Sequence, residues 1–315
     1  MRTAQGIHHI TAIGSDPQRL VDFYTQTLGL RLVKKTVNQD DVSAYHLFFG
    51  DQTGGPGMDL TFFTFPRVAT GSRGAGQVTT TSLAVPAASL PFWQARFEAL
   101  GVTQEPLGNQ FGWERLVFYD PDNQQLELVG VDDLPADTSQ VWTTSQVGVE
   151  QAIRHFHSAR MLVNDKSLIE PILIQSFGYE RMAEEGDLSL YVQPGVQRSA
   201  YLELQVDPDA GPGRNASGTV HHIAFTAEDD GAQNELREQV RRLGLQPTEV
   251  IDRYYFKSVY FRTPAGVLFE IATSGPGFTA DEDAATLGER LALPPFLEPH
   301  REQIEAGLTP VTVQQ

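Results

Sequence analysis

Hydrophobic and polar positions follow one pattern that recurs four times along the chain. Each repeat opens with a strand-like run, continues into a segment with helical spacing of apolar residues, and closes that segment with a glycine. The openings are residues 6–12, 76–82, 152–158 and 218–224, and the closing glycines are Gly29, Gly101, Gly178 and Gly244. Because further strand-like runs follow each glycine, the repeating unit is predicted to be βαβββ.

The first helix and two hairpins mark the repeat most clearly. Asp16 can cap free amides and Pro17 suits the first helical position, so a helix is expected from there to Gly29. Residues 118–128 match residues 261–271 at a constant offset of 143 (261 − 118), with turn residues between two β-rich runs in both. These matches place the modules at about 1–66, 76–132, 150–207 and 218–275. We expect residues 1–135 and 150–275 to form two domains of two modules each, and residues 276–315 to form an arm over the surface.

Composition restricts the chemistry. The 315 residues contain no cysteine, which excludes disulfides and Cys-ligated metal sites, so a metal would be held by histidine and carboxylate. The formal charge of −17 argues against a nucleic-acid partner. No apolar run approaches the ~20 residues that cross a bilayer, and the start lacks the apolar core of a signal peptide. A cytoplasmic protein without a membrane partner is therefore expected.

Two histidine pairs suggest a metal site. His8-His9 recurs as His221-His222, and Glu270 follows the second pair by 48 positions (270 − 222). Two imidazoles and one carboxylate can occupy one face of a divalent metal and leave other positions open, as in iron(II) oxygenases. Since adjacent strand residues point to opposite faces, one histidine of each pair is expected to stand behind the ligand unless a bulge turns it inward.

Four segments carry a resemblance to a known family: residues 6–11, 28–34, 221–225 and 269–273. They resemble the vicinal oxygen chelate superfamily, also called the glyoxalase/bleomycin-resistance/extradiol-dioxygenase fold, and within it the ring-cleaving dioxygenases that open hydroquinones. The resemblance implies an α+β fold in which the four βαβββ modules pair into two curved mixed-sheet cups. It also implies an Fe(II)-dependent enzyme, with Mn(II) as the alternative metal, that inserts both atoms of O2 into a small hydroquinone- or catechol-type diol.

The same resemblance assigns roles to individual residues. His9, His222 and Glu270 would hold the metal, and His221 would move a proton as a catalytic residue. Arg253 and Tyr260 would bind substrate and act in catalysis, and His8 and Thr11 would complete the substrate site. A homo-oligomer is compatible with the sequence.

Module pairing leaves the ligand set open. A cup formed by modules one and four would use His9, His222 and Glu270, whereas consecutive pairing, as in two-domain extradiol dioxygenases, would use His155 in place of His9. We prefer His9 because it lies in the segment most similar to the hydroquinone subgroup. Two other function classes stay open, namely a metal-dependent glyoxalase or thiol-transferase, and a bleomycin-resistance-type binding protein that needs no metal ligands.

Overall fold

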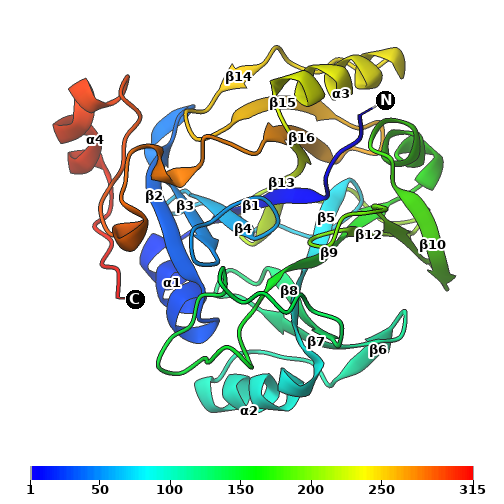
Figure 1. The fold of residues 1–315 in the computed structure, drawn as a ribbon, viewed down its shortest axis with the longest axis horizontal. Helices are drawn as coiled ribbons and strands as arrows, with labels where there is room; N and C mark the ends of the chain where they lie inside the picture. The colour runs from blue at the N-terminus through cyan, green and yellow to red at the C-terminus, as the bar shows by residue number, and fades with distance from the viewer. Residues whose placement is uncertain (1, 315) are drawn as a thin grey trace.

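The computed structural model describes residues 2–314, and four βαβββ modules account for most of them (Figure 1). Module one contains β1 (Ile7–Gly14), α1 (Pro17–Asp22), η1 (Phe23–Thr27), β2 (Arg31–Asn38), β3 (Asp41–Gly50) and β4 (Asp59–Thr64). Module two contains β5 (Gln77–Pro86), η2 (Ala87–Ser89), α2 (Leu90–Leu100), β6 (Gly108–Gln110), β7 (Trp113–Tyr119) and β8 (Gln125–Val131). Module three contains β9 (His155–Val163), η3 (Lys166–Leu168), η4 (Ile172–Ser176), β10 (Glu180–Glu185), β11 (Leu188–Val192) and β12 (Tyr201–Val206). Module four contains β13 (Thr219–Ala227), α3 (Asp230–Arg242), β14 (Ile251–Asp252), β15 (Lys257–Arg262) and β16 (Leu268–Thr273).

The modules pair into two eight-stranded mixed sheets, which confirms the predicted α+β fold with paired cups. The first sheet has the order β14-β15-β16-β13-β1-β4-β3-β2, so it joins module four to module one. The second has the order β10-β11-β12-β9-β5-β8-β7-β6 and joins module three to module two. Each sheet therefore takes one module from each half of the chain. The division into domains at 1–135 and 150–275 stays a prediction.

The first module shows why these elements form where they do. The Asp16 carboxylate accepts hydrogen bonds from the amides of Gln18 and Arg19, and Pro17 opens α1. The helix widens into the π-helical turn η1 and ends before Gly29, whose φ of 69° lies in the left-handed region. Its fully buried Tyr24 packs on Phe62 of the sheet.

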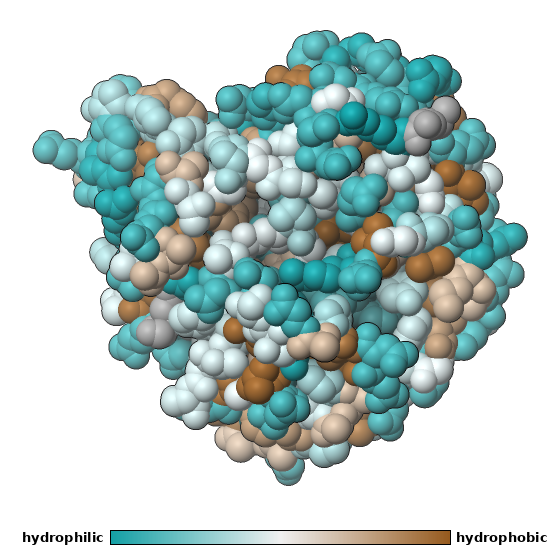
Figure 2. All heavy atoms as spheres, viewed as in Figure 1, coloured by the Kyte–Doolittle hydropathy of each residue, from teal (hydrophilic) through white to brown (hydrophobic). Residues whose placement is uncertain are grey.

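Helices and sheet faces enclose one large apolar cluster and a second, smaller one, while the outer surface is mostly polar. Figure 2 shows hydrophilic side chains over most of one face, with hydrophobic ones scattered among them. In α2, Trp93 and Phe97 are fully buried, and Phe97 packs against Phe118 of β7. Within residues 2–314, no helix is long and apolar enough to cross a membrane.

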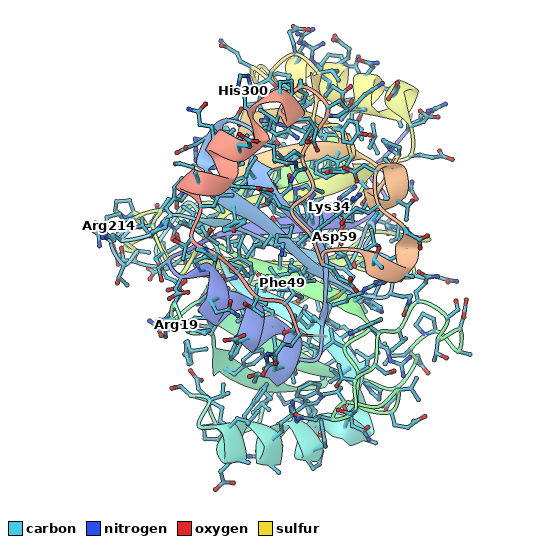
Figure 3. The ribbon with its side chains drawn as sticks, turned by 90° about the vertical axis from the view of Figure 1, so that its left-hand side faces the viewer. Arg19, Lys34, Phe49, Asp59, Arg214 and His300 are labelled. Atoms are coloured by element: carbon cyan, nitrogen blue, oxygen red, sulfur yellow. The ribbon has the colours of Figure 1, made fainter. Side chains whose placement is uncertain are left out.

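The C-terminal arm packs along β2 and ties module one to module four. It carries three short 3₁₀ turns and one helix: η5 (Phe278–Ala280), η6 (Ala284–Thr286), η7 (Glu298–His300) and α4 (Arg301–Gly307). Figure 3 shows it crossing one side of the molecule beside the labelled Lys34. The buried Lys34 ammonium contacts Glu282 and donates to Asp281 at 2.7 Å. The Tyr255 hydroxyl of module four donates to the same Asp281 at 2.8 Å.

We expect Lys34→Met to lower the free energy of unfolding by about 3–5 kcal/mol, because it removes the buried cation from Glu282 and leaves only the exposed Arg290, 3.8 Å away. Urea unfolding followed by circular dichroism measures the loss. The control is the double variant Lys34→Met/Glu282→Met, which should recover most of the stability because an apolar pair replaces the buried ion pair. Equal stability of wild type and Lys34→Met would contradict this account of how the arm is held.

Candidate functional site

Three predicted ligands meet at the centre of the first sheet. His9 lies on β1 and His222 on β13, and these strands pair antiparallel; Glu270 lies on β16, the other neighbour of β13. The Nε2 atoms of the two histidines are 3.2 Å apart, and Glu270 Oε2 lies 3.2 Å from His9 Nε2 and 2.9 Å from His222 Nε2. All three side chains are buried. Within residues 2–314, this is the one group of three or more metal-ligating side chains whose ligand atoms all come this close.

The triangle fits a divalent metal. Three atoms held about 2.1 Å from one ion at right angles would be about 3.0 Å apart, close to the observed edges. Two imidazoles and one carboxylate on one face are the donor set of mononuclear iron(II) oxygenases. Ser258 donates to Glu270 Oε1 at 2.6 Å, whereas in the described part of the chain Oε2 accepts no well-aligned hydrogen bond. That oxygen is therefore free to ligate.

The charge states also suit ligation. Burial alone would raise the pKa of Glu270, but its contacts with His9 and His222 hold this pKa well below its ordinary value, so the carboxylate is ionised. Burial lowers the pKa of His222, which favours the neutral imidazole. Ionised carboxylate and neutral imidazole are the forms that bind metals.

A β-bulge brings His8 to the same side of the sheet as His9. The β1–β13 register shifts between Ile7 and His9, so His8 does not take its normal outward position. His8 Nε2 donates to the Thr273 carbonyl at 3.1 Å, which leaves its Nδ1 as an acceptor for the Nδ1–H of His9 at 3.0 Å. His9 Nε2 then carries a lone pair directed at the metal position. His8 thus orients the ligand and does not line the cavity in front of it.

His221 occupies a matching bulge but a different environment. Thr11 pairs with His222 and Ala12 with Val220, so His221 is the extra, unpaired residue of β13 at this bulge. Its Nδ1 lies 2.8 Å from Nδ1 of His222. Its ring is partly exposed and lines the cavity beside the metal position. Burial, followed by the nearby His222, lowers the pKa of His221 to about 4, so its ring is neutral near pH 7.

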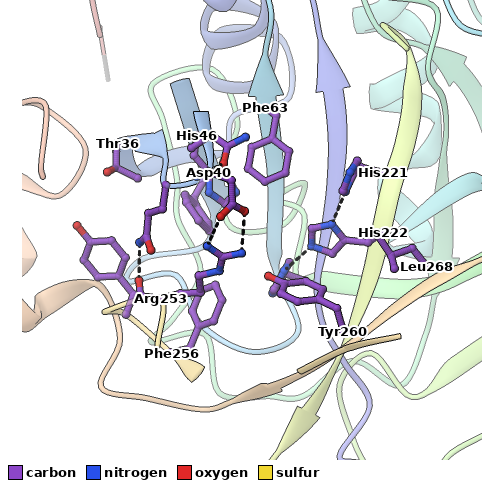
Figure 4. Close-up of a pocket in the computed structure, with 15 residues that line it drawn as sticks. Thr36, Asp40, His46, Phe63, His221, His222, Arg253, Phe256, Tyr260 and Leu268 are labelled. Carbon is purple, nitrogen blue, oxygen red and sulfur yellow. Dashed lines mark hydrogen bonds and ion pairs between the residues drawn. The ribbon is translucent and has the colours of Figure 1, made fainter. Parts of the chain in front are cut away.

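A cavity of about 180 Å³ opens in front of the triangle (Figure 4). Its lining combines five Phe and Tyr rings with seven polar side chains besides the metal ligands. The aromatic lining consists of Phe48, Phe63, Tyr255, Phe256 and Tyr260. The polar lining outside the metal ligands consists of Thr36, Asn38, Gln39, Asp40, His46, His221 and Arg253.

Arg253 and Tyr260 lie at this cavity, as the resemblance implied. The Arg253 guanidinium donates twice to Asp40, at 3.0 and 2.8 Å, and Figure 4 shows this bidentate pair across the cavity mouth. Its charge centre lies 5.7 Å from the centre of the Tyr260 ring. Burial alone would lower the pKa of Arg253, but Asp40 raises it, so the cation is held in place. The pair links module four to the turn after β2 of module one.

Two other candidates from the sequence lie away from the cavity. The buried Thr11 has its hydroxyl 2.7 Å from that of Thr61 and does not line the cavity wall. His155 belongs to the second sheet, where its Nδ1 donates to the Phe156 carbonyl at 2.7 Å. The structure thus brings His9, and not His155, to His222 and Glu270.

Among the lining residues that the sequence analysis did not assign, His46 and Asp40 bear most on the chemistry of the cavity. His46 lies between Phe48 and Phe63, with ring centroids at 4.0 and 4.4 Å, and burial keeps its pKa well below the ordinary value. Asp40 lies in a turn and holds Arg253. The sequence offered one sign of His46, a single histidine within the strand-like run 45–49. It offered no sign of Asp40, because an aspartate in a turn is common without a function.

Comparisons with known proteins identify the family of the chain. The model of the Glyoxalase/Bleomycin resistance protein/Dioxygenase superfamily matches residues 6–128 and 174–271. The chain is 41% identical over 314 residues to "Putative ring-cleaving dioxygenase MhqO" of Bacillus subtilis, covering 100% of this chain and 99% of that protein. It is 34% identical over 310 residues to the chlorohydroquinone/hydroquinone 1,2-dioxygenase of Sphingobium indicum, covering 95% of this chain and 94% of that one.

Solved structures show the same fold. A Bacillus subtilis crystal structure, 41% identical, superposes with a TM-score of 0.95 over 100% of both chains. Glyoxalase I from Zea mays, 15% identical, gives a TM-score of 0.63 over 85% of this chain and 92% of that one, which is a likeness of fold alone. The chain therefore belongs to the glyoxalase/bleomycin resistance protein/dioxygenase superfamily.

Proposed function

We propose that this protein is an Fe(II)-dependent ring-cleaving dioxygenase acting on a hydroquinone- or catechol-type aromatic diol. The observation that carries the proposal is the buried triangle of His9, His222 and Glu270, which opens into an aromatic cavity. The relatives named as ring-cleaving and hydroquinone dioxygenases support it over the full chain. Mn(II) accepts the same donor set and is the alternative metal.

The cavity suits a single aromatic ring. A cavity of about 150 Å³ can hold benzene, so the observed volume of about 180 Å³ fits one ring with small substituents. Phe63 and Phe256 offer apolar faces for such a ring. Bound iron would supply the electronic coupling between a phenolate and dioxygen that the protein groups cannot supply.

The surrounding residues have distinct proposed roles. Arg253, kept cationic by Asp40, would stabilise the ionised substrate oxygen. The Tyr260 hydroxyl would donate a hydrogen bond to the bound substrate. With His222 ligating through Nε2, its Nδ1–H would donate to Nδ1 of His221, so His221 would carry its proton on Nε2 and would present it as a donor to an oxygen atom in the cavity. His8 would fix the tautomer of His9.

The donor set argues against the glyoxalase alternative. A metal-dependent glyoxalase of this fold would typically need a second carboxylate in the cup. In module four, Glu270 lies opposite Ala224 in the strand register, two residues after the ligand His222. In module one, the residue opposite Thr11, two residues after the ligand His9, is Thr61. The position that could supply a second carboxylate is therefore a threonine. A binding protein without metal, in turn, has no need of the triangle.

Anaerobic iron loading followed by oxygen uptake tests the proposal. The panel contains dihydroxybenzenes and methylglyoxal–thiol adducts. Oxygen consumption that requires both iron and a dihydroxybenzene is the expected result. Conversion of a thiol adduct without oxygen uptake would instead support the glyoxalase alternative.

For the ligands, we expect His9→Ala, His222→Ala and Glu270→Gln each to lose tight metal binding, because two remaining ligands hold iron(II) weakly. His155→Ala, the matched control from the second sheet, should keep a full equivalent. Metal analysis after dialysis gives the result, and circular dichroism checks that each variant folds. A full equivalent of metal in His222→Ala or in Glu270→Gln would refute the site.

For the substrate groups, we expect Arg253→Met and Tyr260→Phe to retain iron but to lose about ten- to a hundred-fold in kcat/KM. A lost hydrogen bond to a charged oxygen is worth roughly 1.5–3 kcal/mol. The measurement is steady-state oxygen uptake by iron-loaded protein with methylhydroquinone. Wild-type rates in both variants would show that this stretch is structural only.

A further inference from the structure

His46 lies on the wall of the first cup that module one supplies. Its strand β3 is two strands away from β1, across β4, and this spacing places it about 10 Å from the strand of the ligand His9. Phe63, on the intervening strand β4, has its ring centroid 4.4 Å from that of His46 and 6.3 Å from that of His222. Figure 4 shows His46 and His222 on either side of Phe63. The His46 ring therefore faces the metal position across about the width of one aromatic ring.

Buried hydroxyl groups hold the His46 ring in one orientation. Its Nε2 lies 3.0 Å from the Thr61 hydroxyl, which lies 2.7 Å from the Thr11 hydroxyl, and both threonines are buried. Phe48 and Phe63 flank the ring. No residue of the described chain forms a hydrogen bond with the other nitrogen, Nδ1. His46 is only half-buried and lines the cavity, and its unpaired Nδ1 is not closed off from solvent.

This arrangement suits a hydroxyl group, whichever way the hydrogen bonds run. Burial, followed by the nearby ligand imidazoles, keeps the pKa of His46 well below its ordinary value, so the neutral ring carries one N–H. If this proton lies on Nε2 and is donated to Thr61, Nδ1 accepts a hydrogen bond; if Thr61 donates to Nε2, Nδ1 donates one. A phenol hydroxyl can donate or accept, whereas a methyl group can do neither.

Three neighbouring polar side chains serve the mouth of the cavity. Asp40 accepts two hydrogen bonds from Arg253. The Gln39 side chain donates to the Arg253 carbonyl at 2.8 Å, and the Asn38 side chain accepts from the Asp40 amide at 2.9 Å. The Nδ1 of His46 has no such use within residues 2–314.

We propose that His46 is a specificity-determining residue, whose Nδ1 binds the second hydroxyl group of the diol on the side of the ring opposite the metal position. This role rests on the proposed function and deepens it. A ring that lies along Phe63 with one hydroxyl at the metal position directs the hydroxyl at position 4 toward His46. In a 1,2-diol the second hydroxyl stays beside the metal position and does not reach His46. Thr61 and Thr11 are then positioning residues, since they orient Nδ1 toward the substrate.

Anaerobic isothermal titration calorimetry of the iron-loaded protein tests this role without turnover. Hydroquinone is compared with 4-methylphenol, in which a methyl group of similar size replaces the second hydroxyl. We expect wild type to bind hydroquinone about tenfold or more tightly, because the methyl group would leave Nδ1 without a partner.

Variants of the wall test which residue sets this preference. His46→Phe keeps a flat ring between Phe48 and Phe63 but removes Nδ1, so the preference for hydroquinone should disappear. Thr61→Val removes the hydroxyl that orients His46 and should reduce the preference several-fold; it decides the question if His46→Phe does not fold. His157→Phe removes a buried histidine from the second sheet and is the matched control, which should keep the wild-type preference. A purely structural role of His46 would weaken both ligands alike and leave their ratio unchanged.

Equal affinity of wild type for the two phenols would overturn the proposal, as would a wild-type ratio in His46→Phe or, in its place, in Thr61→Val. Loss of iron from His46→Phe would also overturn it, because His46 would then act on the metal site. Oxygen uptake by the same wild-type protein separates this result from the proposed function. If no dihydroxybenzene is consumed, the proposed function fails; if dihydroxybenzenes are consumed and the ratio does not respond to His46, only its role in specificity fails.

Discussion

The antiparallel pairing of β1 with β13 is the constraint on which the candidate site depends. It places His9 and His222, 213 residues apart in the chain, with their Nε2 atoms 3.2 Å apart. The parallel neighbour β16 then brings Glu270 into the same buried space. This carboxylate lies far from water, where it contacts two imidazoles and accepts a hydrogen bond from Ser258, and a divalent cation would balance its charge.

The two cups show two solutions to the same electrostatic problem. Each buries glutamate from a closing strand at its centre, one in the first cup and two in the second. In the first cup, two imidazoles face the carboxylate; in the second, Arg115 and Arg160 neutralise Glu127 and Glu203 directly. An arginine network neutralises the buried carboxylates without a metal. Duplicated modules can thus keep one shape while their buried carboxylates are balanced in different ways.

The repeat made much of the fold predictable, because glycine spacing and alternating runs are local signals. The four modules and the cup-forming fold were predicted from it and from the resemblance, and both are confirmed. Which modules pair was not determined by spacing, since that depends on strand contacts distant in sequence. The sequence analysis expected His8 and His221 to point away from the site, because adjacent strand residues face opposite sides of a sheet, and it named a bulge only as the exception. His46 and Asp40 were missed because their roles come from module four, which faces them across the cup.

Isotope labelling tests the central claim most directly. The iron-loaded protein reacts with a dihydroxybenzene under labelled dioxygen, and mass spectrometry follows the product. Our account predicts that both labelled atoms enter a single ring-opened product, and that metal-free protein forms none. A product with an intact ring, or one without label, would contradict the assignment of this cup as a ring-cleaving dioxygenase site.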